Sequence, residues 1–276
     1  MTFDKNIAEE MYYRASTQLK ASVDKCIPEN TKIVAIIGGQ PGAGKSSITK
    51  KLEAKYNSNI ISLNGDDFKE LYPRYTKLLA QDPDKTSDIV QPYSNYVVDR
   101  LKEDMIAKGL NVMVEGTMRN PDTPLKTAEQ FTQHGYKAKA HVISVNEHAS
   151  QASCIERYER DVYMNGSGRS VKLESHDEAY SKIPATLEAL SRSEQISNIT
   201  VYNRNGYVIA DLSNGDNVAQ KYVAHREQIT PELVSSVEKS IDNSIQLKEL
   251  RNAPNQEITD LNQLKDKLHN KFHKTI

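Results

Sequence analysis

A loop between residues 39 and 47 contains the residue types that hold nucleotide phosphates. Residues 39–46 fit the pattern Gly-x-x-x-x-Gly-Lys-Ser/Thr at every defined position. The glycines let successive backbone N–H groups turn towards phosphate oxygens, and the helix that follows points its positive end at the same anion. In this pattern the lysine reaches the β and γ phosphates, and the hydroxyl ligates Mg²⁺. The sequence therefore predicts that ATP or GTP binds with Mg²⁺, Ser46 being the metal ligand. The predicted binding residues are Gly39, Gln40, Pro41, Gly42, Ala43, Gly44, Lys45, Ser46 and Ser47.

Acidic residues follow two of the expected strands. Asp66 and Asp67 come shortly after an apolar segment at 59–63, and Glu115 follows another at 111–114. The carboxyl ends of parallel strands meet at one edge of a sheet, where ligands bind. An aspartate there can accept the proton of a hydroxyl group during phosphoryl transfer. The position alone equally allows one of the two aspartates to cap the N-terminus of the next helix.

Other motifs narrow the class of nucleotide-using protein. The Asn-Lys-x-Asp segment with which regulatory GTPases read guanine is absent from the chain. Motor and transport ATPases usually end a strand in aspartate for the magnesium shell, whereas the strand at 111–114 is followed by Glu115. A kinase of a small acceptor needs both a phosphate loop and a nearby carboxylate. A nucleotide-binding regulator without transfer chemistry is disfavoured, because a pure binder needs no base.

Alternating strand and helix patterns predict an α/β fold, a P-loop kinase-like parallel sheet flanked by helices. The apolar segment at 32–38 is typical of a buried parallel strand and leads directly into the phosphate loop. Asn205-Gly206 between apolar segments predicts a hairpin formed by 198–203 and 207–212. The other expected strands are 59–63, 111–114 and 137–145, and the expected helices are 4–25, 45–56, 94–108, 123–134, 147–164 and 176–192.

The polar stretch after residue 214 differs from the rest of the chain. We expect residues 1–214 to form the kinase domain and residues 215–276 to form a helical C-terminal extension. Its pattern predicts two or three charged helices with a break near Pro254. Large aliphatic clusters occur mainly before residue 145, so we expect the hydrophobic core to be concentrated there.

The composition disfavours several kinds of partner. The 276 residues carry a net charge of −1, which gives no overall positive field for nucleic acid or an anionic membrane. The longest apolar segment, 33–37, is too short to span a bilayer, and the N-terminus has no signal-peptide pattern. Cys26 and Cys154 lack metal-ligand spacing. We expect a cytoplasmic protein with reduced thiols and with neither a nucleic-acid nor a membrane partner.

Six motifs in a fixed order resemble those of the zeta toxins of bacterial epsilon/zeta toxin–antitoxin systems. The resemblance covers roughly residues 30–212, and the motifs lie at 39–46, 65–68, 92–95, 115–119, 155–159 and 202–204. It implies a kinase that phosphorylates the 3′-hydroxyl of the amino sugar of UDP-N-acetylglucosamine and thereby blocks synthesis of peptidoglycan precursors. It also implies a bacterial enzyme that a small helical antitoxin neutralises by obstructing the ATP site.

The resemblance also assigns catalytic roles. Lys45 matches the family's phosphate-loop lysine, and Asp66 matches its catalytic aspartate, with Asp67 as the neighbour. The family commonly has Asp-x-Asp here, whereas this chain has asparagine at position 64. Arg157 and Arg169 match two arginines that close over the transferring phosphoryl group, where cations stabilise the developing charge. The segment Asn165-Gly166-Ser167-Gly168 before Arg169 is flexible in composition, which suits a mobile lid.

Substrate contacts follow from the same resemblance. They are Asp66, Asp99, Glu115, Thr117, Arg119 and Thr127. Asp99 stands where the family normally has glutamate, so the side chain here is one methylene shorter. Without the resemblance, Asp99 can also be interpreted as an exposed charge on a helix, and Thr127 as a helix residue with no contact to substrate.

Two questions stay open at the level of sequence. The segment at 115–119 can also serve another polyol, so a kinase of a nucleoside or an antibiotic remains the alternative. Residues 4–25 directly precede the phosphate loop, and we expect them to contact the antitoxin.

Overall fold

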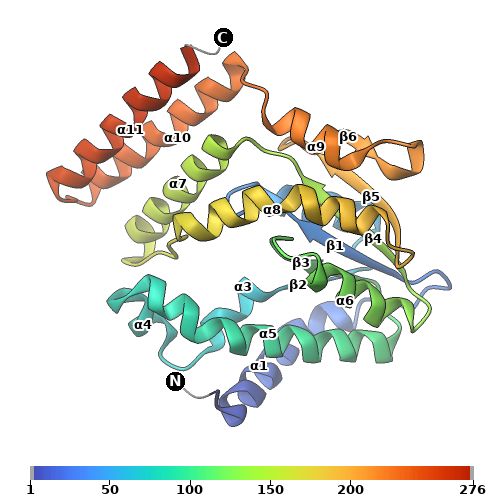
Figure 1. Cartoon of the computed structure of the whole chain (residues 1–276). Coiled ribbons are helices and arrows are strands. Elements are labelled where there is room, and N and C mark those ends of the chain that lie inside the picture. Colours follow the sequence, from blue (N-terminus) through green and yellow to red (C-terminus); the bar gives the residue numbers. More distant parts are fainter. Residues whose placement is uncertain (1–2, 274–276) are drawn as a thin grey trace.

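The computed structural model describes residues 3–273, apart from the side chains of Asp84 and His273. In this part of the chain, six strands form one sheet with helices on both faces (Figure 1). The strand order is β2-β3-β1-β4-β5-β6, with β1 in the centre. The first five strands are parallel, and β6 pairs antiparallel with β5. The predicted fold class is therefore confirmed.

The strands carry apolar residues that are buried on both faces, as a covered parallel sheet requires. The strands are β1 (Ile33–Gly38), β2 (Ile61–Asn64), β3 (Val112–Glu115), β4 (Lys137–Ile143), β5 (Ile196–Tyr202) and β6 (Val208–Asp211). The helices are α1 (Lys5–Val23), α2 (Lys45–Lys55), α3 (Gly65–Phe68), η1 (Lys69–Leu71), α4 (Tyr75–Gln81), α5 (Pro83–Lys108), α6 (Asp122–Thr132), α7 (Glu147–Asn165), α8 (Leu173–Ser191), η2 (Leu212–Asn214), α9 (Val218–Arg226), α10 (Pro231–Leu250) and α11 (Asn255–His273). None of the described helices is both long and apolar enough to cross a membrane.

The long helix α5 begins about three turns earlier than the sequence pattern predicts. The expected helix starts at residue 94, whereas the observed helix contains Pro92, a residue that lacks a backbone donor and usually ends a helix. In the structure α5 runs from Pro83 through Pro92 to Lys108. Tyr93, Val97, Leu101 and Met105 are all buried, so packing of this apolar stripe outweighs the lost backbone hydrogen bond.

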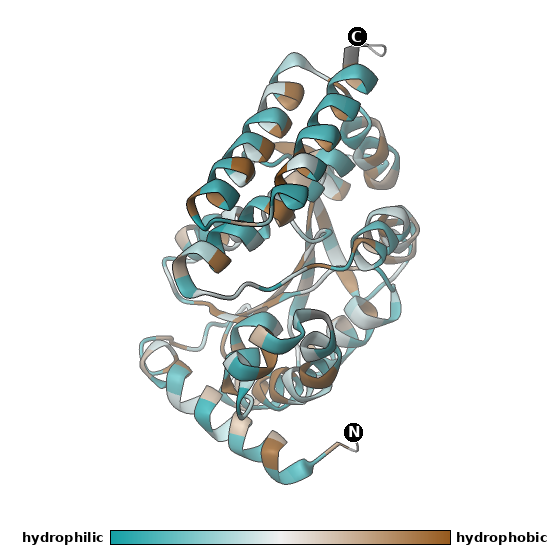
Figure 2. Cartoon of the chain, turned by 90° about the vertical axis from the view of Figure 1, so that its left-hand side faces the viewer, coloured by the Kyte–Doolittle hydropathy of each residue, from teal (hydrophilic) through white to brown (hydrophobic). Residues whose placement is uncertain are grey.

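Most of the buried hydrophobic residues among those described lie before residue 145, as expected, and later helices complete the core on both faces of the sheet. One cluster covers one face of the sheet and includes residues of α1, α5, α6, α8 and α9. A second cluster covers the other face, where Ile37 and Ile48 join Val237, Ile241 and Phe272. The C-terminal helices contribute to the core because each is polar on average but buries one apolar stripe. Figure 2 shows hydrophobic and hydrophilic residues alternating along α10 and α11.

The C-terminal part forms three long helices, as the pattern predicts, with a break between Leu250 and Asn255. Helix α10 packs on α7 and α11 packs on α10, at the opposite end of the molecule from α1 and α5 (Figure 1).

Parallel register brings the ends of three strands together. Asn64 lies opposite Glu115, and Glu115 lies opposite Ile37. The segments that follow β1, β2 and β3 therefore leave the sheet at the same edge, where ligands bind in open α/β sheets.

Candidate active site

The phosphate loop is held in shape by contacts that leave no room for side chains. Gly42 and Gly44 have φ angles of +75° and +90°, in the left-handed region that favours glycine. A Cβ atom on Gly42 would lie 2.0 Å from the Ser150 carbonyl oxygen and 2.8 Å from Cys154 Sγ. Glycine at this position is therefore required by the packing of the loop on α7.

Gln40 anchors the loop to the segment after β4 and to α7. Its side chain is fully buried. The Nε2 atom donates hydrogen bonds to the Val145 carbonyl oxygen (3.0 Å) and to Ser150 Oγ (3.2 Å). Sequence reasoning placed Gln40 in the loop but did not reveal this anchoring role, which depends on residues more than one hundred positions away.

Lys45 points back over its own loop. Its Nζ donates to the carbonyl oxygens of Gly39 (3.0 Å) and Gln40 (3.4 Å) and lies 3.9 Å from Glu115 Oε1. Burial lowers the pKa of Lys45, although the charges of Glu115 and Asp66 oppose this. Burial also raises the pKa of Glu115, against the opposing effect of Lys45. The site thus holds a cation and a carboxylate that share a partly dehydrated space.

The two serines after Lys45 differ. Ser46 is exposed at the first turn of α2. Ser47 Oγ donates to the Gly44 carbonyl oxygen at 2.8 Å.

Asp66 lies between two cations. Its carboxylate is 2.8 Å from Lys69 Nζ and 3.7 Å from a guanidinium nitrogen of Arg169, which also donates to the Asp66 carbonyl oxygen (3.3 Å). Burial raises the pKa of Asp66, but Lys69, Arg169 and Lys45 together outweigh it, so the net shift is downwards. Burial raises the pKa of Asp67 instead. Asp66 is therefore the more strongly ionised member of the pair.

The alternative that one of these aspartates caps a helix is wrong. The cap of α3 is Asn64, whose Oδ1 accepts a hydrogen bond from the Asp66 backbone N–H at 3.1 Å. The cause is that β2 ends one residue later than predicted, which leaves Asp66 and Asp67 in the first helical turn.

The two arginines approach from different sides. Arg157 lies on α7, where its charge acts on Lys45 and Glu115. Its Nε is buried and has no hydrogen-bond partner among the described residues. Arg169 lies in the segment between α7 and α8 and contacts Asp66. The structure therefore brings Lys45, Asp66, Glu115, Arg157 and Arg169 to one edge of the sheet.

The segment after Glu115 turns sharply. Met118 has φ +53° and is buried, and a Cβ on Gly38 would lie 2.2 Å from its Sδ atom. Thr117 is partly buried, and the exposed Arg119 lies 3.4 Å from Glu178. Met118 thus holds the segment against the end of β1.

Two predicted substrate residues make no described hydrogen bond or ion pair with this group. Asp99 is exposed on α5 and pairs with Lys102 Nζ at 2.7 Å. Thr127 is buried on α6. No hydrogen bond or ion pair described for residues 3–273 joins either side chain to Asp66.

Sequence reasoning missed two cations beside the site. Lys69 is buried although it lies only three residues after Asp66, a spacing that could have suggested the contact. Arg204 belongs to a recognised motif, but no role was predicted for it. Its guanidinium donates to the Ala149 carbonyl oxygen (3.3 Å) and to Ser153 Oγ (2.5 Å), and its Cγ lies 3.6 Å from the Cβ position of Gly44.

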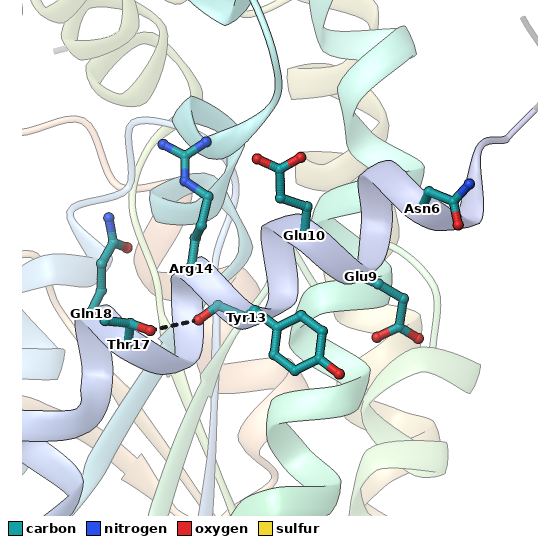
Figure 3. Close-up of a pocket in the computed structure, with 7 residues that line it drawn as sticks. All are labelled: Asn6, Glu9, Glu10, Tyr13, Arg14, Thr17 and Gln18. Atoms are coloured by element: carbon teal, nitrogen blue, oxygen red, sulfur yellow. Dashed lines mark hydrogen bonds between the residues drawn. The ribbon is translucent and has the colours of Figure 1, made fainter.

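A separate open cavity of about 640 Å³ lies along α1 (Figure 3). All of its lining residues belong to this helix, and they are Asn6, Glu9, Glu10, Tyr13, Arg14, Thr17 and Gln18. None is a predicted catalytic or substrate-binding residue.

The family model described as Zeta toxin matches residues 17–214 of the chain. The chain belongs to the zeta toxin family. It is 30% identical to Toxin zeta of Enterococcus hirae over 221 residues, which are 76% of this chain and 77% of that protein. It is 24% identical to Toxin PezT of Streptococcus pneumoniae, with 76% of this chain and 85% of that protein covered.

Solved structures agree with the fold of a zeta toxin. A chain from the PezAT toxin-antitoxin system of Streptococcus pneumoniae aligns with a TM-score of 0.76 at 22% identity, covering 89% of this chain and 98% of that chain. A chain of the AvrRxo1-ORF1:AvrRxo1-ORF2 complex with ATP aligns with a TM-score of 0.56 at 13% identity, covering 89% and 84%. The family predicted from the six motifs is therefore confirmed.

Proposed function

We propose that this zeta toxin transfers the γ-phosphate of ATP to the 3′-hydroxyl of the amino sugar of UDP-N-acetylglucosamine. The observation that carries the proposal is the position of the Asp66 carboxylate, which contacts Lys69 and Arg169 and lies near enough to Lys45 of the phosphate loop for that charge to lower its pKa. A protein that only bound nucleotide would gain nothing from an ionised carboxylate facing this loop. Family membership and the ATP complex of a neighbour with the same fold support the choice of donor and acceptor.

The chemistry follows from the charges. The sugar hydroxyl oxygen forms a bond to the γ-phosphorus, the bond from phosphorus to the β–γ bridging oxygen breaks, and ADP leaves. Asp66 accepts the hydroxyl proton, since its lowered pKa keeps the carboxylate ionised at neutral pH. Lys45, Arg157 and Arg169 stabilise the negative charge that spreads over the phosphoryl oxygens. Arg169 exchanges its contact with Asp66 for one with phosphate in this scheme.

The residues present fit a magnesium ion. Mg²⁺ prefers oxygen ligands and keeps several waters, and Ser46 presents an exposed hydroxyl at the start of α2 while Glu115 supplies a carboxylate nearby. Bound Mg²⁺ would neutralise charge on the nucleotide phosphates. The described residues contain no cluster of three histidine, cysteine or acidic side chains that could hold a metal alone, which suits an ion delivered with nucleotide.

The test is to incubate the protein with Mg-ATP and a panel of UDP-sugars and nucleosides and to follow ³¹P signals. A new phosphomonoester on UDP-N-acetylglucosamine supports the proposal. ATP binding without turnover on any acceptor would show a nucleotide-binding regulator instead. GTP in parallel establishes the donor preference.

A kinase of another hydroxyl acceptor is the second candidate. The observation that favours it is Asp99, which pairs with Lys102, together with the buried position of Thr127. Two of the contacts implied for the sugar thus lie outside the group formed by Lys45, Asp66 and Glu115. ATP consumption that appears only with a nucleoside or another polyol in the same panel would establish this candidate.

We further propose a small helical antitoxin as partner and the bacterial cytoplasm as location. The PezAT neighbour is a toxin–antitoxin system, and the outer face of α1 offers an exposed Tyr13 with charged residues on both sides (Figure 3). Tyr13→Ala combined with Arg14→Ala is expected to weaken antitoxin binding without changing transfer, which calorimetry with the antitoxin would measure. Unchanged affinity would move the contact away from α1.

A further inference from the structure

Arg157 is positioned by its helix and not by a side-chain partner. Its Nε is buried without a hydrogen-bond partner among the described residues, yet its charge acts on Lys45. Because no neighbouring side chain holds the Arg157 guanidinium, its position depends on the position of the α7 backbone. The placement of α7 therefore decides whether Arg157 faces the phosphate loop.

The first half of α7 is held by the phosphate loop and by Arg204 in the turn after β5. Gln40 donates to Ser150 Oγ, and Arg204 donates to the Ala149 carbonyl oxygen and to Ser153 Oγ. These contacts end one turn before Arg157. Another set of contacts must hold the second half of the helix, which runs on to exposed residues at Tyr163 and Met164.

That second set comes from α10 and α11, which we name the C-terminal hairpin. Residues 157 and 159 lie on roughly opposite sides of α7, because successive residues of an α-helix are about 100° apart. Glu159 is 1% exposed and lies 2.8 Å from Lys248 Nζ and 2.9 Å from Arg251 Nε. Both cations also contact Glu257, at 2.6 Å and 2.8 Å. Glu159 of α7 thus contacts two cations at the end of α10, and the same cations contact Glu257 of α11.

The surrounding contacts have a different character. Ala149, Ala152 and Ile155 of α7 share an apolar cluster with Val237 and Ile241 of α10. Apolar surfaces hold two helices together but discriminate weakly between neighbouring registers, whereas a buried carboxylate with two cations has directional partners. Asn243 adds one more directional contact, since it donates to Glu156 Oε1 at 3.1 Å.

We propose that the C-terminal hairpin is a positioning device for Arg157, with Glu159 as the positioning residue. This rests on the proposed function, because it assigns α10 and α11 a part in phosphoryl transfer. The buried contact of Glu159 with Lys248 and Arg251 fixes the position of the second half of α7. The same helix then presents Arg157 to the phosphate loop from its other side. Both helices of the hairpin lie beyond residue 214, where the family match ends.

The test compares two isosteric changes in the same charge cluster. Glu159→Gln weakens the link to α7, whereas the matched control Glu257→Gln removes the other carboxylate and leaves that link intact. For Glu159→Gln we expect kcat to fall on the order of tenfold, with KM for ATP within about twofold, because a small misplacement of a catalytic group is costly. Glu257→Gln is expected to retain kcat. Equal losses in both variants would overturn the proposal, as would full activity of Glu159→Gln.

A second readout does not depend on transfer. Cys154 lies one turn before Arg157, and its thiol contacts the phosphate loop at Gly42. If the second half of α7 loosens, we expect Cys154 to react several-fold faster with iodoacetamide, on the order of threefold or more. Cys26, which is buried after α1 beside the Ser58 carbonyl oxygen, is the internal reference, and mass spectrometry separates the two sites. Unchanged alkylation of Cys154 in Glu159→Gln would overturn the proposal even if wild-type protein transferred phosphate to no acceptor, in which case the proposed function alone would fail.

A milder variant covers the case in which Glu159→Gln does not fold. Arg251→Lys keeps the charge but loses the planar group that contacts Glu159 through Nε and Glu257 through Nη2. We expect a smaller loss of kcat and a smaller gain in Cys154 alkylation in the same directions. Lys248→Arg, which preserves a cation able to bind two carboxylates, is expected to retain wild-type values. Wild-type values for Arg251→Lys would overturn the proposal.

Discussion

The phosphate loop and the segment that carries Asp66 follow strands of one sheet, but different forces hold them. Around the loop, Gln40 is fully buried, and Gly42 packs against the Ser150 carbonyl with no space for a side chain. On the acceptor side, the Asp66 side chain is about half-exposed (48%), and its contacts are ion pairs with Lys69 and Arg169.

This difference matches the tasks that the proposed function gives to the two regions. The nucleotide phosphates need a fixed set of backbone donors, which close packing provides at no cost during reaction. The acceptor side must admit a substrate and then release a product, so its charges need partners that can exchange. Ion pairs at a half-exposed carboxylate are weak enough for such exchange. The comparison predicts that a change in the packing of the loop lowers nucleotide affinity, whereas changes around Asp66 alter transfer and its pH dependence and leave nucleotide affinity unchanged.

The largest effect is expected for Lys45→Ala. Removal of the cation that reaches the phosphates should lower transfer on the order of 10³-fold or more, because a preorganised charge in a dry site is lost. The same variant should relieve toxicity when the protein is expressed in cells. Steady-state assays and growth curves measure the two effects. Persistent toxicity of Lys45→Ala would mean that the harm has another source.

The second largest effect is expected for Asp66→Asn, a variant that distinguishes the role of the Asp66 segment in transfer from the role of the phosphate loop in ATP binding. It removes the base but keeps the volume, so we expect transfer to fall about 10²- to 10³-fold while ATP affinity stays the same. Fluorescence titration with a labelled nucleotide checks affinity, and Asp67→Asn serves as the matched control with a much smaller loss. Normal transfer in Asp66→Asn would remove this residue from the mechanism.

Gly42→Ala tests the close packing of the loop. A left-handed backbone costs alanine about 1–2 kcal/mol, and the new Cβ would press on the Ser150 carbonyl. We expect ATP affinity to fall about tenfold or more, since each tenfold corresponds to roughly 1.4 kcal/mol. Gly116→Ala is the control, because open space surrounds a Cβ at that position. Equal affinities for the two variants would argue against a loop held by packing.

The smallest effect is expected for Lys69→Met, and it is chiefly a change in pH dependence. Lys69 helps to hold the pKa of Asp66 below its ordinary value, with Arg169 and Lys45 acting in the same direction and Asp67, Glu70, Glu115 and Tyr75 nearby. A base with a low pKa loses activity only as pH falls through that pKa. Removing Lys69 raises the pKa, so the acidic limb of kcat/KM should move to higher pH.

The rate for Lys69→Met at neutral pH should fall within about tenfold, because the carboxylate remains ionised but less firmly placed. Lys69→Arg should keep both the rate and the acidic limb of the kcat/KM profile at their wild-type values. A pH–rate profile that stays unchanged in Lys69→Met would show that Lys69 supports the fold and not the base.

The sequence predicted much of the fold because its signals are local. Alternating apolar strands and amphipathic helices require only neighbouring residues, and the hairpin at Asn205-Gly206 and the break near Pro254 are local as well. The missed part lies between residues 65 and 93, where α5 continues through Pro92 because its apolar stripe is buried. The share of the core that comes from the C-terminal helices was not predicted, for a related reason. Average polarity conceals the single buried stripe of α10, which includes Val234, Val237 and Ile241.

The sequence by itself determined the phosphate loop, since eight contiguous residues contain all the backbone freedom and the cation that phosphates need. It also determined the family, through six motifs whose order does not depend on how they pack. Only the tertiary structure decided that Asn64 is the cap and Asp66 the carboxylate between cations. The same holds for the link from Glu159 to the C-terminal hairpin. The physical reason is the distance along the chain over which each property is set. Backbone geometry is set by adjacent residues, whereas the pKa and position of a charged side chain depend on the residues that the fold brings within a few ångströms of it.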